Sequence, residues 1–190
     1  MLLIEPIAMV LTLLCVLKLS DKSHIGWPLG ILAAAAYFIV FYEDKLYMQT
    51  GLQIIYIIQS IYGWIIWKKD GLLNLQITKA KNYHISRVFM VAIFSGIIGG
   101  HFLETYTDAS FPYLDAISVS IALLANYLLA KRVVQSWYLW CIVNMILIYI
   151  TGENELWWTM ALYVILLLIA ISTAIDWTNE VKRTEDGKKI

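Results

Sequence analysis

Residues 156–175 read LWWTMALYVILLLIAISTAI, a stretch of twenty residues without a single charged side chain. An α-helix rises about 1.5 Å per residue, so this stretch can cross the roughly 30 Å hydrocarbon core of a bilayer. Apolar stretches of similar character, some of them shorter, occupy residues 2–19, 27–42, 47–67, 88–102, 114–130 and 137–150. The sequence therefore predicts an all-α integral membrane protein with seven transmembrane helices.

The overall composition supports a membrane protein and excludes most soluble classes. Of the 190 residues, 61% are hydrophobic and 15% are charged, whereas soluble domains carry about 25% charged residues. The formal net charge is zero, so it points to no nucleic-acid partner. The two cysteines, Cys15 and Cys141, lie inside apolar stretches, where a free thiol behaves as a small hydrophobic side chain. We expect neither a disulfide nor a metal site from them.

The distribution of Lys and Arg tests the number of helices and predicts their orientation. Basic residues in short loops are retained on the cytoplasmic side of a membrane. With seven spans and an external N-terminus, 13 of the 14 Lys and Arg residues are cytoplasmic, and Lys45 alone is external. The cytoplasmic set is Lys18, Lys22, Lys68, Lys69, Lys79, Lys81, Arg87, Lys131, Arg132, Lys182, Arg183, Lys188 and Lys189. We therefore expect a multi-pass membrane protein with an external N-terminus and a cytoplasmic C-terminus.

Tryptophan is enriched, and seven of the 8 Trp residues fall near predicted helix ends. Tryptophan rings concentrate at the headgroup level of a bilayer, which predicts an interfacial position for these seven. They are Trp27, Trp64, Trp67, Trp137 and Trp177 at cytoplasmic ends, and Trp157 and Trp158 at an external end. Trp140 lies about one helical turn deeper than the others, which makes it a candidate for another role.

The chain contains a repeat with an offset of 110 residues. This offset pairs Trp27 with Trp137 and Trp67 with Trp177, and it pairs similar charges, Glu5 with Asp115 and Lys22 with Arg132. Helices one to three then match helices five to seven in the same orientation, and helix four reverses the chain direction between them. Such a 3+1+3 parallel repeat is a transporter architecture with the substrate near the bilayer midplane. A membrane scaffold built by duplication is the alternative.

The repeat predicts four parts of the chain. They are a first three-helix bundle at residues 1–67, a cytoplasmic linker with the connecting helix at 68–113, a second three-helix bundle at 114–177, and a cytoplasmic tail at 178–190.

A polar stripe follows one face of the helix predicted at residues 47–67. Spacings of three and four place its members on one side: Gln49, Gln53, Tyr56, Ser60, Gly63 and Trp67, with Gln59 and Tyr62 at the edge. An unpaired amide in hydrocarbon costs several kcal/mol, so this face cannot point into lipid. It faces either a substrate or other helices through hydrogen bonds.

Three further helices carry candidate binding residues. Trp140 and Asn144 are four residues apart and share a face, where an indole can stack on a flat ring and an amide can donate and accept hydrogen bonds. Asn126 shares a face with Ser118 and Ala122, and Tyr163 shares one with Thr159. Headgroup contact and simple helix packing are the alternatives for each of these residues.

Charged residues are missing from the predicted interior, and this absence restricts the substrate. Without a buried cation, nothing replaces the water that a phosphate group must lose, so phosphate esters are disfavoured. A delocalised cation or a neutral heteroaromatic can instead lie on aromatic faces, where cation–π attraction contributes roughly 0.5–2 kcal/mol. We expect uncoupled facilitated diffusion, because ion coupling usually employs buried carboxylates or histidines. Neither a nucleotide-binding loop nor a hydrolase motif is found, so we predict no catalytic residues, no metal and no cofactor.

Small residues are concentrated in the helix predicted at residues 88–102. Ser95, Gly96, Gly99 and Gly100 give overlapping small-xxx-small spacings, which allow two helices to approach closely. The spacing fits an oligomer contact and an internal interface equally well.

Several of these residues resemble the PnuC family of bacterial vitamin transporters. The resemblance rests on Trp27-Pro28-Leu29-Gly30, on Leu46-Tyr47 followed by Leu52-Gln53 and Tyr56, on Tyr62-Gly63-Trp64 with Trp67, and on Lys131-Arg132 followed by Trp137, Trp140 and Asn144. It implies a 3+1+3 fold similar to SWEET transporters, often trimeric, with Trp140, Asn144, Gln53, Tyr56 and Gln59 in contact with substrate. Gln135 departs from the family, in which an acidic residue often precedes the Trp.

The resemblance implies uptake of nicotinamide riboside or, in the related PnuT branch, of thiamine. The family is taken to act by facilitated diffusion, with a cytoplasmic kinase that traps the vitamin without binding the transporter. The implied partners are the vitamin, the lipid bilayer and further copies of the chain. A non-transport scaffold or an intramembrane enzyme is the alternative of another class.

Overall fold

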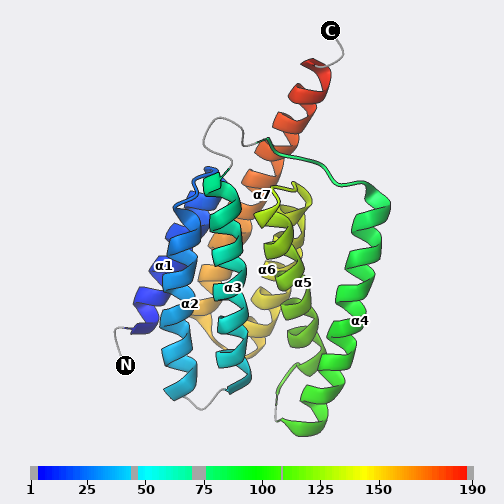
Figure 1. Ribbon diagram of the computed structural model, residues 1–190. Coiled ribbons are helices and arrows are strands. Elements are labelled where there is room, and N and C mark those ends of the chain that lie inside the picture. The colour runs from blue at the N-terminus through cyan, green and yellow to red at the C-terminus, as the bar shows by residue number, and fades with distance from the viewer. Residues whose placement is uncertain (1–3, 44–46, 70–75, 108, 188–190) are drawn as a thin grey trace. The chain divides into compact units, whose positions relative to one another are not determined.

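The computed structural model describes residues 4–43, 47–69, 76–107 and 109–187, and it is built from helices (Figure 1). The prediction of an all-α chain with seven helices is confirmed, since a helix is found at each expected stretch. They are α1 (Ile4–Ser20), α2 (Gly26–Glu43), α3 (Tyr47–Lys69), α4 (Asn82–Tyr106), α5 (Pro112–Ala130), α6 (Gln135–Glu153) and α7 (Trp157–Gly187).

Within the described ranges, four helices are long and apolar enough to cross a bilayer by themselves. Their qualifying stretches are Thr50–Lys69, Ile85–Tyr106, Pro112–Ala130 and Trp157–Asp186, and a shorter apolar stretch covers Gly26–Val40. The exposed faces of these helices carry large apolar side chains such as Ile58, Met90, Phe94 and Leu168. An apolar exterior of this kind is suited to lipid, because lipid tails are as apolar as leucine.

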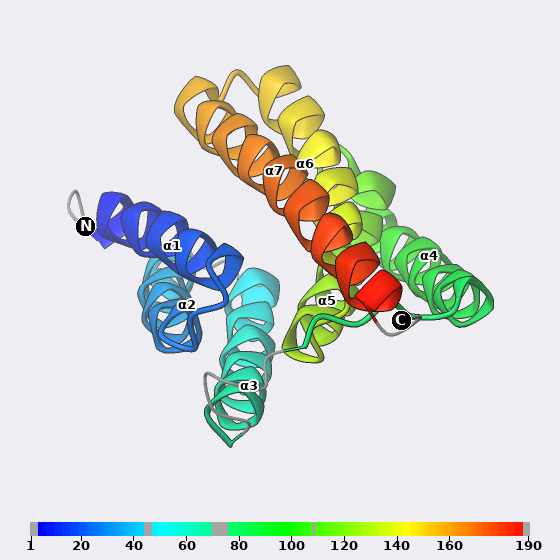
Figure 2. The ribbon, with the colours of Figure 1, turned by 90° about the horizontal axis from the view of Figure 1, so that it is seen from above.

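The chain forms two compact units, which we call the N-terminal unit (residues 1–76, with α1–α3) and the C-terminal unit (residues 77–190, with α4–α7). Within each unit, consecutive helices pack side by side, as the view along the helices shows (Figure 2). In the C-terminal unit, the packing order is α4 on α5, α5 on α6 and α6 on α7. The extra helix α4 is therefore packed against the second half of the repeat.

The core of the C-terminal unit is made by α4, α5 and α6. Its buried members are Ala92, Ile121, Ala122, Leu124, Ala125, Leu128, Val133, Leu139 and Val143, and Trp140 packs against them. Alanines along α4 and α5 keep the two helices close, which leaves the larger side chains of α6 to fill the remaining space.

Two glycines of α4 are pressed against α5. A Cβ atom on Gly96 would lie 2.7 Å from the Cα of Ile117, and one on Gly100 would lie 2.7 Å from the Cα of Tyr113. Backbone atoms cannot move aside, so only glycine fits at these two positions. The small-residue spacing of α4 therefore serves this internal interface. Of the two alternatives that the sequence left open, an oligomer contact and an internal interface, the structure supports the second.

The predicted repeat is confirmed by the turns that end α1 and α5. In the first turn, Lys22 has a φ of 59°, and the Ser23 amide donates to the Lys18 carbonyl at 2.8 Å. In the second, Arg132 has a φ of 57°, and the Val133 amide donates to the Leu128 carbonyl at 3.0 Å. Both helices end in the Schellman arrangement, with a left-handed residue just beyond the helix.

The tryptophan pairs repeat with the same offset. Trp27 meets Trp67 edge to face with ring centroids 5.5 Å apart, and Trp137 meets Trp177 at 5.8 Å. All four rings are buried inside their units, so the prediction that they lie at the headgroup level is wrong. Sequence position places them near helix ends, but the helix face that carries them points inward. Trp158, by contrast, is 87% exposed.

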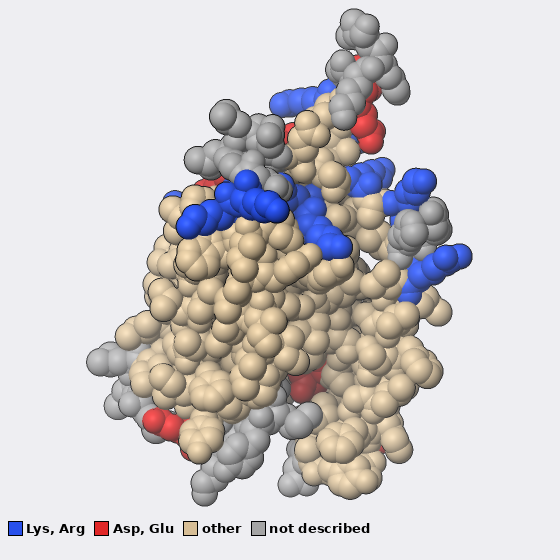
Figure 3. Space-filling view, in the orientation of Figure 1, with Lys and Arg blue, Asp and Glu red and all other residues tan. Residues whose placement is uncertain are grey.

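The two ends of the C-terminal unit carry opposite charges. The Thr78 amide donates to the Arg132 carbonyl, and the Val134 amide donates to the Thr78 carbonyl, both at 3.0 Å. These bonds place the start of α4 beside the α5–α6 turn. This basic end carries Lys79, Lys81, Arg87, Lys131 and Arg132. Figure 3 shows blue side chains over the start of α4, and both blue and red side chains on the last turns of α7.

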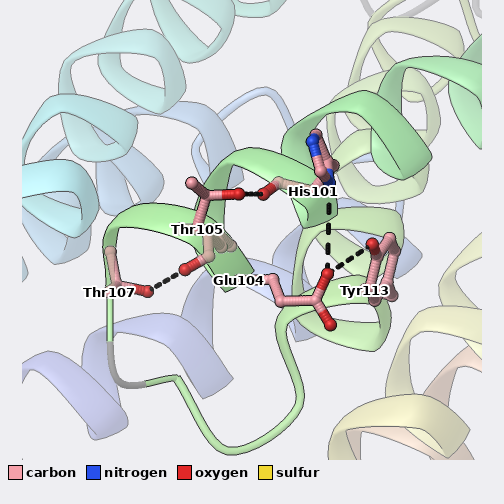
Figure 4. Close-up of polar contacts among 6 residues, drawn as sticks. His101, Glu104, Thr105, Thr107 and Tyr113 are labelled. Atoms are coloured by element: carbon pink, nitrogen blue, oxygen red, sulfur yellow. Dashed lines mark hydrogen bonds and ion pairs between the residues drawn. The ribbon is translucent and has the colours of Figure 1, made fainter.

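At the opposite end α4 meets α5, and we call this the acidic end, with Glu104, Asp115, Glu153 and Glu155. The Tyr113 hydroxyl donates to Glu104 at 2.7 Å, and His101 lies 4.0 Å from the same carboxylate (Figure 4). The segregation within this unit agrees with the charge pattern of the sequence. Asp44, Lys45 and Asp108, which that pattern also uses, lie outside the described residues.

Candidate functional site

The seven residues expected to bind substrate fall into two groups, one in each unit. Gln53, Tyr56 and Gln59 lie on α3 in the N-terminal unit. The C-terminal unit holds the other four, which are Asn126 on α5, Trp140 and Asn144 on α6, and Tyr163 on α7.

The polar stripe of α3 points inward, as its chemistry requires. Gln53 is only 7% exposed, and Ser60 is buried as well, while Tyr56 and Gln59 are half-buried. Thr50, one turn before Gln53, is a further buried polar residue that we did not select from the sequence. The side chain of Gln49 lies outside the described part of the chain.

Part of this stripe serves helix packing. Gly63 touches the indole of Trp27 on α2, and a Cβ atom on Gly30 would lie 3.3 Å from the Ser60 hydroxyl oxygen. Ser60 and Gly63 thus belong to the α2–α3 contact. Gln53 differs, because no hydrogen bond to its amide is found among the residues that the structure describes. Tyr56 and Gln59 already take part in interactions.

The α6 pair combines a ring with an amide that has no partner. Trp140 is half-buried, and its indole packs against the core of the C-terminal unit. Asn144 follows one turn later and is only 4% exposed. Within the described ranges, its amide makes no hydrogen bond. The amide is not among the fully buried polar atoms that lack a partner, so part of it stays accessible and a ligand can form hydrogen bonds with it.

Asn126 lies near the level of Trp140. It is four residues before the end of α5, and Trp140 is five residues after the start of α6. With a rise of 1.5 Å per residue, both lie roughly 6–8 Å from the α5–α6 turn. Ser118, which shares the Asn126 face, donates its hydroxyl to the Asp115 carbonyl at 2.8 Å. The Ser118 hydroxyl therefore donates its proton within α5 and not to a ligand.

Tyr163 lies closer to the acidic end than Asn144 does. Tyr163 is six residues from the start of α7, and Asn144 is nine residues from the end of α6, which corresponds to depths of about 9 Å and 13 Å. Asp115 lies at the same acidic end, in the first turn of α5 and on the helix face that carries Ser118 and Asn126. The structure thus adds Asp115, which the sequence indicated only as the repeat partner of Glu5, to the surroundings of the candidate residues.

The ring and amide pair occurs in only one half of the repeat. The offset of 110 pairs Trp140 with Gly30 and Asn144 with Ala34. At Gly30, a Cβ atom would already lie 3.2 Å from the sulfur of Cys15, so an indole has no space there. The two halves share their turns and buried tryptophans but differ at these two positions. A general requirement of the fold therefore does not explain Trp140 and Asn144.

The buried interior is almost free of charge. Among the described residues, Arg132 is the only charged side chain that is buried, and it lies at the α5–α6 turn rather than in the middle of a helix. The same residues contain no cluster of His, Cys, Asp and Glu that could hold a metal ion. The geometry therefore favours binding of an uncharged or delocalised ring over binding of a phosphate.

Comparison with known proteins gives a consistent result. A family model described as nicotinamide mononucleotide transporter matches residues 2–179. The nicotinamide riboside transporter PnuC of Escherichia coli strain K12 is 23% identical over 207 residues, covering 94% of this chain and 86% of that protein. The PnuC of Neisseria mucosa is 26% identical over 194 residues, covering 95% and 73%.

A solved structure also matches. It is described as the crystal structure of the vitamin B3 transporter PnuC, with a TM-score of 0.76 and 22% identity, and the match covers 95% of this chain and 82% of the other. At this level of identity, the likeness shows a shared fold.

Proposed function

Because the chain belongs to the nicotinamide mononucleotide transporter family, we propose that it carries nicotinamide riboside across the membrane by facilitated diffusion. The family and the solved relative are transporters rather than enzymes. The bacterial relatives and the apolar helices support a multi-pass protein of the bacterial inner membrane. The curated relatives are named for the riboside, whereas the family is named for the mononucleotide, so the substrate must be argued from the site.

The absence of buried charge favours the riboside over the mononucleotide. A phosphate brings close to two negative charges at neutral pH, and removing an ion from water costs several kcal/mol unless charges or hydrogen bonds replace the water. Within the described ranges, the interior offers no Lys or Arg away from the α5–α6 turn. Nicotinamide riboside carries only a delocalised ring cation, which aromatic faces can accommodate.

The single observation that carries this proposal is the unpaired amide of Asn144, one turn from Trp140. The carboxamide of nicotinamide has one acceptor and two donors, the complement of an asparagine side chain, so two hydrogen bonds can form between them. The flat ring can stack on the Trp140 indole. Among the described residues, the Asn144 amide has no hydrogen bond that such a ligand would have to displace.

The remaining candidate residues supply a second set of contacts in this proposal. In the N-terminal unit, Gln53 offers a further amide for which no hydrogen bond is found among the described residues. Tyr56, Gln59, Asn126 and Tyr163 contribute further hydrogen-bonding groups, all of them half-buried.

We propose uncoupled transport, because no carboxylate or histidine is fully buried in the described spans, and the half-buried Asp115 lies in the first turn of α5. His101 is on α4, but its side chain is 76% exposed. A cytoplasmic kinase would then drive net uptake, because the phosphorylated product no longer fits the uncharged interior. The proposed orientation has an external N-terminus, which the clustering of basic residues in alternate loops supports, and the proposed assembly contains further copies of the chain.

The test is uptake of labelled nicotinamide riboside, nicotinamide mononucleotide and thiamine into proteoliposomes. We expect the riboside to equilibrate down its gradient, with or without a proton ionophore, and the mononucleotide to enter far more slowly. Absence of riboside flux would overturn the proposal. Faster thiamine flux would support the alternative substrate of the same family, and loss of flux with the ionophore would overturn the uncoupled mechanism.

Two tryptophan variants separate a role in binding from a role in folding. Stacking of a ring on an aromatic side chain contributes about 1–3 kcal/mol, so we expect Trp140→Ala to weaken riboside binding at least fivefold. Trp158→Ala is the matched control, because Trp158 is 87% exposed, and it should bind normally. Equal affinities for the two variants would place Trp140 outside the site.

A further inference from the structure

Asp115 is a half-buried carboxylate in the first turn of α5. In the described part of the chain, no hydrogen bond or ion pair to this carboxylate is found. A negative charge at a helix start is favoured by the helix dipole, by about 0.3–1 kcal/mol, which accounts for a carboxylate at this position. It does not account for the lack of any positive partner.

The charges of the C-terminal unit explain why Asp115 is not neutralised. Every described Lys and Arg of this unit lies at the basic end or on the last turns of α7, the opposite end from Asp115. The titratable base of the acidic end is His101, and it faces Glu104, which also accepts the Tyr113 hydroxyl (Figure 4). The field of Asp115 therefore acts on whatever enters the unit from the acidic end.

The neighbours of Asp115 connect it to the proposed site. Asp115 shares the face of α5 that carries Ser118, Ala122 and Asn126, and Ala122 belongs to the core cluster against which Trp140 packs. Asp115 is three residues from the start of α5 and Asn144 is nine residues from the end of α6. A ring bound beside Asn144 would therefore lie about 9 Å deeper along the helices than the carboxylate.

We infer that Asp115 gives the transporter its preference for a positively charged ring over a neutral ring of the same shape. This inference rests on the proposed function, and it adds a specificity residue to the same site. The pyridinium of nicotinamide riboside must lose water as it enters, and a carboxylate at the entrance offsets part of that cost. The same charge repels a phosphate, which strengthens discrimination against the mononucleotide.

The repeat supplies a matched control. Glu5, the counterpart of Asp115, also lies in the first turn of its helix, but its side chain is exposed. Charges in contact with water are screened within about 10 Å at ordinary ionic strength. Neutralising Glu5 should therefore leave the substrate preference unchanged, although the chemical change is the same.

The experiment compares two ligands that differ in charge. Nicotinamide riboside is a cation, and its reduced dihydro form is a neutral molecule of nearly the same shape. We expect the wild-type protein to bind the cation more tightly, and Asp115→Asn to weaken binding of the cation about fivefold to tenfold while the neutral form binds as before. Glu5→Gln should bind both ligands like the wild type.

Each outcome bears on a different claim. Equal weakening of both ligands in Asp115→Asn, or no change in either affinity, would leave the ratio of the two affinities unchanged and would overturn the inference. Either result leaves nicotinamide riboside as the substrate. Failure of the wild-type protein to bind either ligand would instead overturn the proposed function.

Discussion

The indole of Trp27 occupies the space in which a side chain on Gly63 would have to lie. A Cβ atom on Gly63 would be 2.5 Å from the Cε2 carbon of that ring. Trp67 also contacts the Trp27 indole, edge to face, with the ring centroids 5.5 Å apart. Trp27 is thus held between two positions of α3, and its place fixes how closely α2 and α3 approach.

Gly63→Ala should destabilise the protein. The added methyl group would displace a buried indole, and overpacking of this kind costs about 1–3 kcal/mol. We expect a lower thermal unfolding temperature in detergent, followed by tryptophan fluorescence, because the reporter ring is the one that is displaced.

Gly51→Ala is the control on the same helix. Nothing lies within 4 Å of a Cβ atom built at Gly51, and alanine is a better helix former than glycine by about 1 kcal/mol. This variant should be as stable as the wild type or more stable. A similar loss of stability in both variants would mean that glycine is needed in α3 for a reason other than contact with Trp27.

The α4–α5 interface gives a second pair of variants that differ by one residue. Gly100→Ala places a methyl group 2.7 Å from the Cα of Tyr113, whereas at Gly99 the nearest atom, the Cβ of Ala116, is 3.4 Å away. Because α4 packs chiefly on α5, the first variant should loosen α4 and speed its proteolysis. Gly99→Ala should be tolerated, and equal sensitivity of the two would contradict the packing described above.

The sequence alone predicted much of the fold, and for clear physical reasons. The length of an apolar stretch and the position of basic loops are one-dimensional signals, so the helices could be located without a structure. The repeat could be found for the same reason, since Trp27 and Trp137 are separated by the same 110 residues as Trp67 and Trp177.

The direction in which a side chain points was harder to predict. Trp27 and Trp137 were expected at the headgroup level and are instead buried, because a position near a helix end does not specify the helix face. The Gly96 and Gly100 spacing predicted a close approach but could not name the partner helix. The substrate contacts of Asn144 and Gln53 remain predictions, and their unpaired amides became visible only in the structure.

Asn144→Leu should separate stability from function. Leucine is close to asparagine in size, and among the described residues no hydrogen bond of the Asn144 amide would be lost, so the change should cost little stability. We expect an unfolding temperature close to that of the wild type without ligand, together with loss of riboside binding. Riboside should then raise the unfolding temperature of the wild type but not of the variant.

Asn154→Leu is the matched control, since Asn154 is exposed and its amide donates to the Ile150 carbonyl at 2.8 Å. This change should lower stability slightly and leave riboside binding intact. If Asn144→Leu were instead the less stable variant, its amide would have a structural partner and the site would have to be revised.

Gln135, at the start of α6, forms two hydrogen bonds with the segment before α4. Its Nε2 donates to the Ala80 carbonyl at 2.9 Å, and its Oε1 accepts from the Ala80 amide at 3.1 Å. The bridge between Thr78 and Val133 lies directly beside this pair. A glutamate in this position, as the family resemblance implies for many relatives, can accept from the amide but cannot donate to the carbonyl.

Gln135→Glu should therefore loosen this attachment. Loss of one hydrogen bond costs about 1 kcal/mol, which corresponds to roughly fivefold faster hydrogen exchange at the amides of Ala80 and Val134. Gln76→Glu introduces the same charge at an exposed position of the same segment, and it should leave the exchange rates unchanged. Equal exchange rates in both variants would show that the bridge at Thr78 holds the segment by itself. Faster exchange in Gln135→Glu alone would show that the Gln135 side chain helps to hold the start of α4 against the second half of the repeat.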